Sequence, residues 1–113
     1  MLSTGLKHLE TNEDIKNVLE NHENVMICCG RMGPMCTPVY SAMQSLEPHY
    51  SHVVFRDLDF DIAEADFIKS IPECALFRGL PFTVFFKNGN VAAATTSIQS
   101  QEQITEILNK AFC

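Results

Sequence analysis

Two short apolar runs, Phe82–Phe86 and Val91–Ala94, are joined by the tetrapeptide Lys87-Asn88-Gly89-Asn90. Asn and Gly tolerate the positive φ that a type I′ turn requires, so Asn-Gly between apolar runs is the strongest short-range signal for a β-hairpin. Ser100 and Gln103 then match the capping box of a helix N-terminus. We therefore expect the chain to close with two antiparallel strands and a helix, whose buried face holds Ile104, Ile107, Leu108 and Ala111.

Upstream of the hairpin, helical and strand patterns alternate along the chain. Thr11 or Asn12 can cap a first helix, and the uninterrupted apolar run Val25–Cys29 is typical of a strand buried on both faces. The order (β)αβαβαββα implies a mixed central sheet of four to five strands with helices on both faces, an α/β fold. The remaining expected elements are a helix through Val39, Ala42, Met43 and Leu46 that ends at Pro48, a strand in His52–Asp61, and a short helix through Ala63, Phe67 and Ile71.

Composition narrows the function classes. The 113 residues, 46% of them hydrophobic, suit a single domain spanning 1–113. The net charge is -6 and no Lys/Arg cluster occurs, which argues against nucleic-acid binding. The segment Met1–Glu10 lacks the apolar core of a signal peptide, and the apolar runs are too short to cross a membrane. We expect a cytoplasmic monomer. Its four histidines are dispersed, so we expect neither a metal nor a cofactor.

The segment Arg78-Gly79-Leu80-Pro81-Phe82-Thr83-Val84-Phe85-Phe86-Lys87-Asn88-Gly89 resembles the back half of the thioredoxin family, which has an R-G-I-P-T step, an apolar strand and F-K-N-G. The resemblance extends over nearly the whole chain. It implies the thioredoxin fold, with Pro81 as the family's cis-proline. A cis bond there would expose the backbone of Leu80 to an extended substrate peptide.

The family's active-site motif is altered. Thioredoxins carry W-C-G-P-C, in which an exposed thiol at a helix N-terminus attacks and a buried thiol resolves the mixed disulfide. The corresponding segment here is Cys28-Cys29-Gly30-Arg31-Met32-Gly33-Pro34-Met35-Cys36, and the chain contains no C-x-x-C and no tryptophan. Two alignments with the family motif are possible. Aligning Gly33-Pro34 with the Gly-Pro of the motif places Met32 and Met35 at the positions of the two thiols. Counting back from Tyr50 along the helix instead places Cys36 at the position of the resolving thiol and Gly33 at that of the nucleophile.

One redox interpretation remains. Cys29 ends the expected strand and Cys36 begins the helix, so the ends of the turn between them can approach the ~4.4–6.8 Å Cα separation of a disulfide. The helix dipole and Arg31 would favour a thiolate at Cys36. Cys28 and Cys29 point to opposite faces of a regular strand, so only one of them can face Cys36. The alternative to this redox interpretation is that Cys28 and Cys29 are both small apolar core residues of a buried strand.

Two main functions follow, and both remain open. The first is a thiol–disulfide redox protein, with Cys36 and Cys29 as catalytic residues, protein or peptide substrates, and a reductant similar to thioredoxin reductase. The second is a redox-inactive binding module that holds a partner with the turn Met32-Gly33-Pro34-Met35 and the groove at Leu80-Pro81. A third is a sensor whose single thiol, Cys36, forms lasting mixed disulfides. Outside this site we expect Cys74 to be a surface thiol, although its loop could bring it to the active-site face, and Cys113 to be an accessible terminal thiol. Asp57 and Asp59 are expected on a solvated strand edge, although Asp57 sits where the thioredoxin family often places a charged residue beneath the active site.

Overall fold

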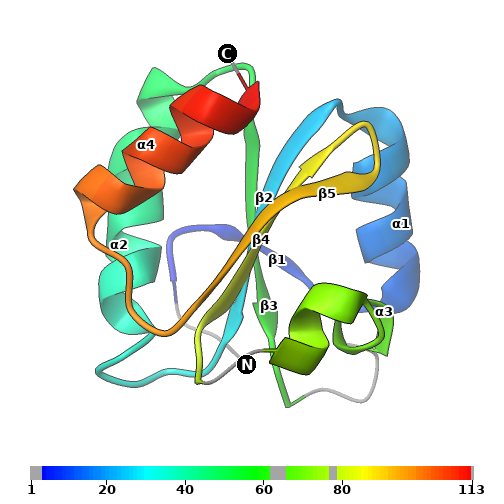
Figure 1. The fold of residues 1–113 in the computed structure, drawn as a ribbon, viewed down its shortest axis with the longest axis horizontal. Helices are drawn as coiled ribbons and strands as arrows, with labels where there is room; N and C mark the ends of the chain where they lie inside the picture. Colours follow the sequence, from blue (N-terminus) through cyan, green and yellow to red (C-terminus); the bar gives the residue numbers. More distant parts are fainter. Residues whose placement is uncertain (1–3, 62–65, 77–78, 113) are drawn as a thin grey trace.

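The computed structural model of the chain describes residues 4–61, 66–76 and 79–112. At its centre is a five-stranded sheet in the order β1-β3-β2-β4-β5 (Figure 1). β1, β3 and β2 run parallel, and β4 is antiparallel to both β2 and β5. The expected mixed sheet is confirmed. Its strands are β1 Lys7–Leu9, β2 Asn24–Gly30, β3 Val54–Asp59, β4 Phe82–Lys87 and β5 Asn90–Thr96.

Helices cover both faces of the sheet. The α-helices are α1 Asn12–Asn21, α2 Thr37–Leu46, α3 Asp66–Lys69 and α4 Gln101–Phe112, and two short 3₁₀ helices are η1 Glu47–His49 and η3 Pro72–Leu76. Figure 1 shows α2 and α4 together on one face, and α1 with α3 on the other. Each face buries its own apolar cluster, and successive residues of the central strand β2 contribute alternately to the two clusters. No helix in the described ranges is long and apolar enough to cross a membrane.

The turn and cap signals of the sequence are confirmed. Asn88 and Gly89 have φ of 53° and 80°, as a type I′ hairpin requires. At the start of α4 the Gln103 amide donates to the Ser100 hydroxyl, and the Ser100 amide donates back to the Gln103 side chain. Thr11, rather than Asn12, caps α1 in a reciprocal pair with Asp14. These local contacts fix where the helices begin.

Several expectations need correction. Pro48 lies within η1, which continues the turn of α2 beyond Leu46. The buried face of α4 is formed by Ile104, Leu108 and Phe112, while Ile107 and Ala111 are only half-buried. Asp57 is not on a solvated edge, because β3 is covered by strands on both sides and Asp57 is completely buried. Of the helix expected through Ala63, Phe67 and Ile71, the structure describes α3 at Asp66–Lys69. Ala63, Arg78 and Cys113 lie outside the described residues.

Candidate active site

The turn between β2 and α2 ends at Cys36, the N-cap residue of α2. Gly33 holds this turn, since its carbonyl accepts from the amides of Cys36 at 3.2 Å and Thr37 at 2.9 Å. Pro38 follows in the first turn of the helix, where a missing amide costs no hydrogen bond. The Cys36 side chain therefore sits at the positive end of the α2 dipole, where negative charge is favoured.

The Cys36 thiol is 4% exposed and accepts a hydrogen bond from the Arg31 amide at 3.4 Å. The space around Gly30 shows how tightly the residues near the Cys36 thiol are packed. A Cβ on Gly30 would lie 2.8 Å from Cys36 Sγ, 2.7 Å from the Tyr40 hydroxyl and 3.3 Å from Pro81 Cβ. The Tyr40 hydroxyl in turn donates to the Arg31 carbonyl at 3.3 Å. The thiol, the phenol and the proline thus converge on the end of β2.

The wall beside Cys36 is the Gly79-Leu80-Pro81 step. The Leu80–Pro81 peptide bond is cis, and Leu80 is half-buried. The Ser97 amide donates to the Gly79 carbonyl at 3.1 Å, which ties this step to the segment after β5. A side chain at position 79 would meet the Ser97 hydroxyl at 2.9 Å. The site is therefore built from the ends of three strands and the start of α2.

The two adjacent cysteines of β2 face opposite sides of the sheet. Cys28 packs in the cluster under α2 and α4, together with Cys36 and Tyr40. Cys29 packs in the cluster under α1 and α3, together with Cys74. The structure therefore does not bring Cys29 to Cys36, and the expected pairing needs revision. Strand alternation allows only one of Cys28 and Cys29 to face Cys36, and in the structure that residue is Cys28.

A row of polar side chains crosses the sheet at the level of Cys28. Register pairs His8 with Asp57, Asp57 with Cys28, and Cys28 with Thr83. The Asp57 carboxylate, fully buried, is bonded by the Thr4 hydroxyl, and its Oδ1 lies 2.5 Å from His8 Nδ1. The His8 side chain is 27% exposed, so this pair links the buried carboxylate to the surface. Cys28 thus lies beside a carboxylate that the sequence reading placed in solvent.

The buried thiols are held in their neutral form. Burial raises the pKa of Cys28 well above its ordinary value, and the neighbouring Thr83 hydroxyl opposes this only in part. Burial likewise raises the pKa of Cys29, and the charges of Cys28 and Cys74 add to the effect. The pKa of Tyr40 is raised by burial and by the nearby thiols. At neutral pH these three groups are therefore uncharged.

Comparison with known proteins rests on structure alone, because no protein-family model and no curated sequence matches the chain. Thioredoxin O2 of Arabidopsis thaliana superposes with a TM-score of 0.74 at 13% identity, covering 99% of this chain and 98% of that one. Plasmodium falciparum thioredoxin gives 0.75 at 18% identity, covering 94% and 100%. An Entamoeba histolytica thioredoxin variant gives 0.72 at 16% identity, covering 95% and 100%. The chain adopts the thioredoxin fold.

Sequence reasoning missed His8, and it favoured a solvated strand edge for Asp57 over a place beneath the active site. Asp57 and His8 lie on adjacent parallel strands, and only the pairing register shows that they meet. The signal that could have found Asp57 is its place two residues after Phe55, because strand alternation puts both on the face that Phe55 buries. In the described part of the chain no three His, Cys, Asp or Glu side chains gather as metal ligands.

The turn before α2 exposes apolar and charged groups. Met32 and Met35 are 48% and 46% exposed, and Ile98, after β5, is 46% exposed. Arg31 makes a bidentate ion pair with Asp61, at 2.7 Å and 2.8 Å, which lowers the pKa of that carboxyl. A shallow hollow of about 560 Å³ adjoins this end of the thioredoxin fold. Its lining carries no charged side chain and includes Pro38, Ser41, Ile98, Gln99 and Gln101.

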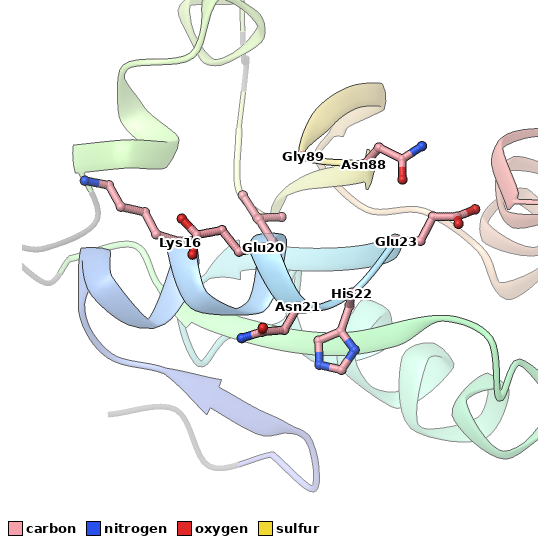
Figure 2. A pocket seen from close by; sticks show the side chains of 8 residues that line it. Lys16, Glu20, Asn21, His22, Glu23, Asn88 and Gly89 are labelled. Carbon is pink, nitrogen blue, oxygen red and sulfur yellow. The ribbon is translucent and has the colours of Figure 1, made fainter.

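A second hollow, of about 530 Å³, lies at the opposite end of the sheet (Figure 2). It is formed where α1 ends and where the β4–β5 hairpin turns, and Lys16, Glu20, His22 and Asn88 are among its lining residues. These side chains are exposed. All four described cysteines are buried, and the strand directions place Cys28, Cys29 and Cys36 at the other end of the sheet. This hollow therefore takes no part in the thiol site.

Because its buried thiols are neutral, we expect the folded protein to become less stable at alkaline pH. In the unfolded chain Cys28 and Cys29 ionise near their ordinary pKa of 9.0, whereas in the native chain they stay protonated. The unfolded state then binds fewer protons, so stability is full below that pKa and falls as pH rises through it. We expect the free energy of unfolding to drop by about 1.4 kcal/mol per pH unit for each of these thiols above pH ~9. Urea titrations under reducing conditions between about pH 8 and 10.5 measure this slope.

The matched control for this pH dependence is the double variant Cys28→Ala, Cys29→Ala. Alanine fills part of each buried site and carries no proton, so the variant keeps the cores and loses the two titrations. Its unfolding free energy should fall less steeply with pH than that of the wild type. Equal slopes for the two proteins would contradict the assignment of neutral buried thiols.

Proposed function

We propose that this protein is a thiol–disulfide redox protein that acts on protein or peptide disulfides, with Cys36 as its reacting thiol. The observation that supports this most is the position of Cys36 at the N-terminus of α2, beside Pro81 and hydrogen-bonded by the Arg31 amide. A thiolate is the nucleophile of disulfide exchange, and a helix N-terminus favours it.

The partner of Cys36 in this proposal is Cys28 rather than Cys29, because only Cys28 shares its face of the sheet. The Cys36 thiolate attacks one sulfur of the substrate disulfide and releases the other as a thiolate. Cys28, on losing its proton, then attacks Cys36 Sγ and releases the second substrate thiolate. The protein dithiol is oxidised to a Cys28–Cys36 disulfide, and the substrate disulfide is reduced to two thiols.

Access to Cys36 sets a condition on this reaction. The thiol is 4% exposed, so a substrate sulfur reaches it only when the residues packed around it shift. Burial also keeps Cys28 protonated, which makes the resolving step depend on a base. Asp57 is the carboxylate in register with Cys28, and its contact with His8 gives the proton a route outward.

The proposed docking surface for the substrate surrounds this thiol. It comprises Met32, Gly33, Pro34 and Met35 on the turn, with Leu80 and Pro81 on the facing wall. Exposed methionines adapt to varied apolar side chains, and the uncharged hollow beside Ile98 continues the surface. The proposal includes a cytoplasmic location, a monomeric protein, and a reductant similar to thioredoxin reductase that restores the dithiol.

A redox titration tests the proposed function directly. The protein is equilibrated across a series of glutathione or dithiothreitol potentials, free thiols are alkylated, and bonds are mapped by mass spectrometry. We expect one two-electron transition whose oxidised product contains a Cys28–Cys36 bond. A matched Cys36→Ser variant should lose that transition. If the wild type shows no bond involving Cys36 at any potential in that series, the redox proposal fails.

A second candidate function has its own support. All four described cysteines are buried, while Met32 and Met35 are among the most exposed large apolar side chains. This combination fits a redox-inactive module that holds a partner protein at the same surface. Such a module uses the docking residues but forms no disulfide at Cys36. The redox titration therefore separates the two candidates, because only the redox protein shows a transition.

Both candidates predict that the two methionines contribute to docking. For the redox function we expect the double variant Met32→Ser, Met35→Ser to raise KM for a protein disulfide roughly fivefold, because apolar contact area is lost. The rate with a small aromatic disulfide should change little. The control Lys16→Ser, Glu20→Ser alters exposed residues at the far end of the sheet and should match the wild type. An unchanged KM in the methionine variant would exclude this surface.

A further inference from the structure

Cys29 and Cys74 lie together on the face of the sheet that the candidate active site does not use. Both belong to the apolar cluster beneath α1 and α3, with Cys29 completely buried and Cys74 6% exposed. Cys74 was expected at the surface. Instead η3 returns from α3 onto the sheet, on the side where Figure 1 shows α1 and α3.

Local structure holds each thiol in this cluster. Cys29 is the last residue but one of β2, between Leu58 of β3 and Phe82 of β4. Cys74 lies in the middle of η3, and its amide donates to the Ile71 carbonyl at 3.0 Å. Ile68 of α3 is also fully buried in this cluster. The two thiols thus come from segments far apart in the sequence and enter one apolar layer.

Their electrostatic surroundings differ from those of Cys28. Burial raises the pKa of Cys74, and the Lys69 ammonium partly offsets this. Lys69 also opposes the rise in the pKa of Cys29, to which burial, Cys28 and Cys74 contribute. The Lys69 ammonium lies over the Phe60 ring, 4.7 Å from its centroid. A cation near both thiols favours their thiolate forms, and Cys74, at 6% exposed against 0% for Cys29, is the one that a small oxidant reaches first.

We propose that Cys29 and Cys74 form a second redox site, an intramolecular disulfide that forms on the face of the sheet opposite Cys36 when a small peroxide oxidises the protein. On losing its proton, the Cys74 thiol attacks hydrogen peroxide, takes up one oxygen as a sulfenic acid and releases hydroxide, which that proton converts to water. The Cys29 thiol then attacks the Cys74 sulfur, forms the S–S bond and releases a second water. Two thiols are oxidised, and one peroxide is reduced to two waters.

A Cys29–Cys74 bond would affect the candidate active site from the opposite face of the sheet. η3 leads along the chain to Gly79-Leu80-Pro81, the wall beside Cys36. A Cys29–Cys74 bond ties η3 to β2 and so restrains the chain that enters this wall. Phe82, which follows Pro81, packs in the same cluster as both thiols. Oxidation would therefore tighten the docking wall without consuming Cys36, and the inference stands whether or not Cys36 is redox-active.

Two matched two-cysteine variants test this inference. The first retains only Cys29 and Cys74, with Cys28→Ala, Cys36→Ser and Cys113→Ser. The second retains only Cys28 and Cys74, with Cys29→Ala in place of Cys28→Ala. Because Cys28 faces the other side of the sheet, the second variant has the same number of thiols and nearly the same sequence separation in the wrong geometry. Circular dichroism establishes that both are folded.

Each folded variant is treated with hydrogen peroxide, quenched, alkylated and digested for mass spectrometry. We expect the first to yield the cross-linked peptide with roughly tenfold more bond than the second, because a disulfide tolerates only a narrow range of Cα separations. In denaturant both should cross-link, which shows that the oxidant is effective. Equal cross-linking of the two folded variants would overturn the proposal, as would a folded first variant that forms no bond.

The wild-type protein provides a test that does not depend on the variants folding. After peroxide treatment, fragmentation of the peptide that contains Cys28 and Cys29 identifies the sulfur bonded to Cys74. A Cys29–Cys74 bond supports the second site. Cys74 bonded to Cys28 or Cys36, or left as an unpaired oxidised thiol, contradicts it.

Discussion

Replacing Cys36 by serine should abolish the reduction of insulin disulfides, lowering the rate ~1,000-fold or more, because a serine hydroxyl cannot form the mixed disulfide. Serine is nearly isosteric with cysteine and can still accept the hydrogen bond of the Arg31 amide, so the fold should remain. The measurement is insulin turbidity with dithiothreitol as the electron source, corrected for the uncatalysed rate. Thermal unfolding of the same sample establishes that the variant is folded.

The matched control for this prediction is Cys74→Ser, another buried cysteine but one on the opposite face of the sheet. It should reduce insulin at nearly the wild-type rate under these reducing conditions. Retained activity in the Cys36 variant would mean that another thiol reacts and would remove the main residue of the proposed site. Loss of activity in both variants would indicate a general effect on the fold.

The second large effect is expected at Gly30. A methyl group there would lie 2.8 Å from Cys36 Sγ and 2.7 Å from the Tyr40 hydroxyl, closer than real Cβ contacts occur. Gly30→Ala should therefore destabilise the protein by about 2–3 kcal/mol, because the thiol and the phenol must both shift within a packed core. Urea unfolding measures the change. The displaced Cys36 should also react faster with a thiol reagent in the folded state.

The chain contains a matched control for the Gly30 prediction. Gly33 lies in the turn that follows Gly30 and has open space around its Cβ position, so Gly33→Ala should leave stability within roughly 0.5 kcal/mol of the wild type. A Gly30→Ala protein as stable as Gly33→Ala would show that the end of β2 is less tightly packed than described.

Most of the fold could be predicted from the sequence, because its signals are local. Asn88-Gly89 has the positive φ values of the expected turn, and Ser100 and Gln103 make the expected cap, since these contacts involve neighbouring residues. The order of elements followed from apolar periodicity. The resemblance around Pro81 then selected one arrangement of those elements, and the structural comparisons confirm the thioredoxin fold.

The site was harder to predict, because it depends on which side of the sheet each residue faces. An apolar run does not show which face of the sheet each residue of β2 occupies, so the predicted partner of Cys36, Cys29, is the wrong one of the two adjacent cysteines. Asp57 and His8 meet only through the β1–β3 register. The burial of Cys74 depends on how η3 packs against the sheet, a contact that no local pattern encodes. Each of these errors at the site therefore concerns tertiary packing and not secondary structure.

The placement of Cys28 and Cys29 on opposite faces has an evolutionary consequence. One dipeptide supplies a thiol to each half of the molecule, so inserting or deleting a single residue in β2 would exchange the two thiols between the halves. Gly30 opposes such a slip, because another residue in its place would collide with Tyr40. Homologues that retain both cysteines should therefore keep the length of β2 unchanged and vary in the turn that follows it.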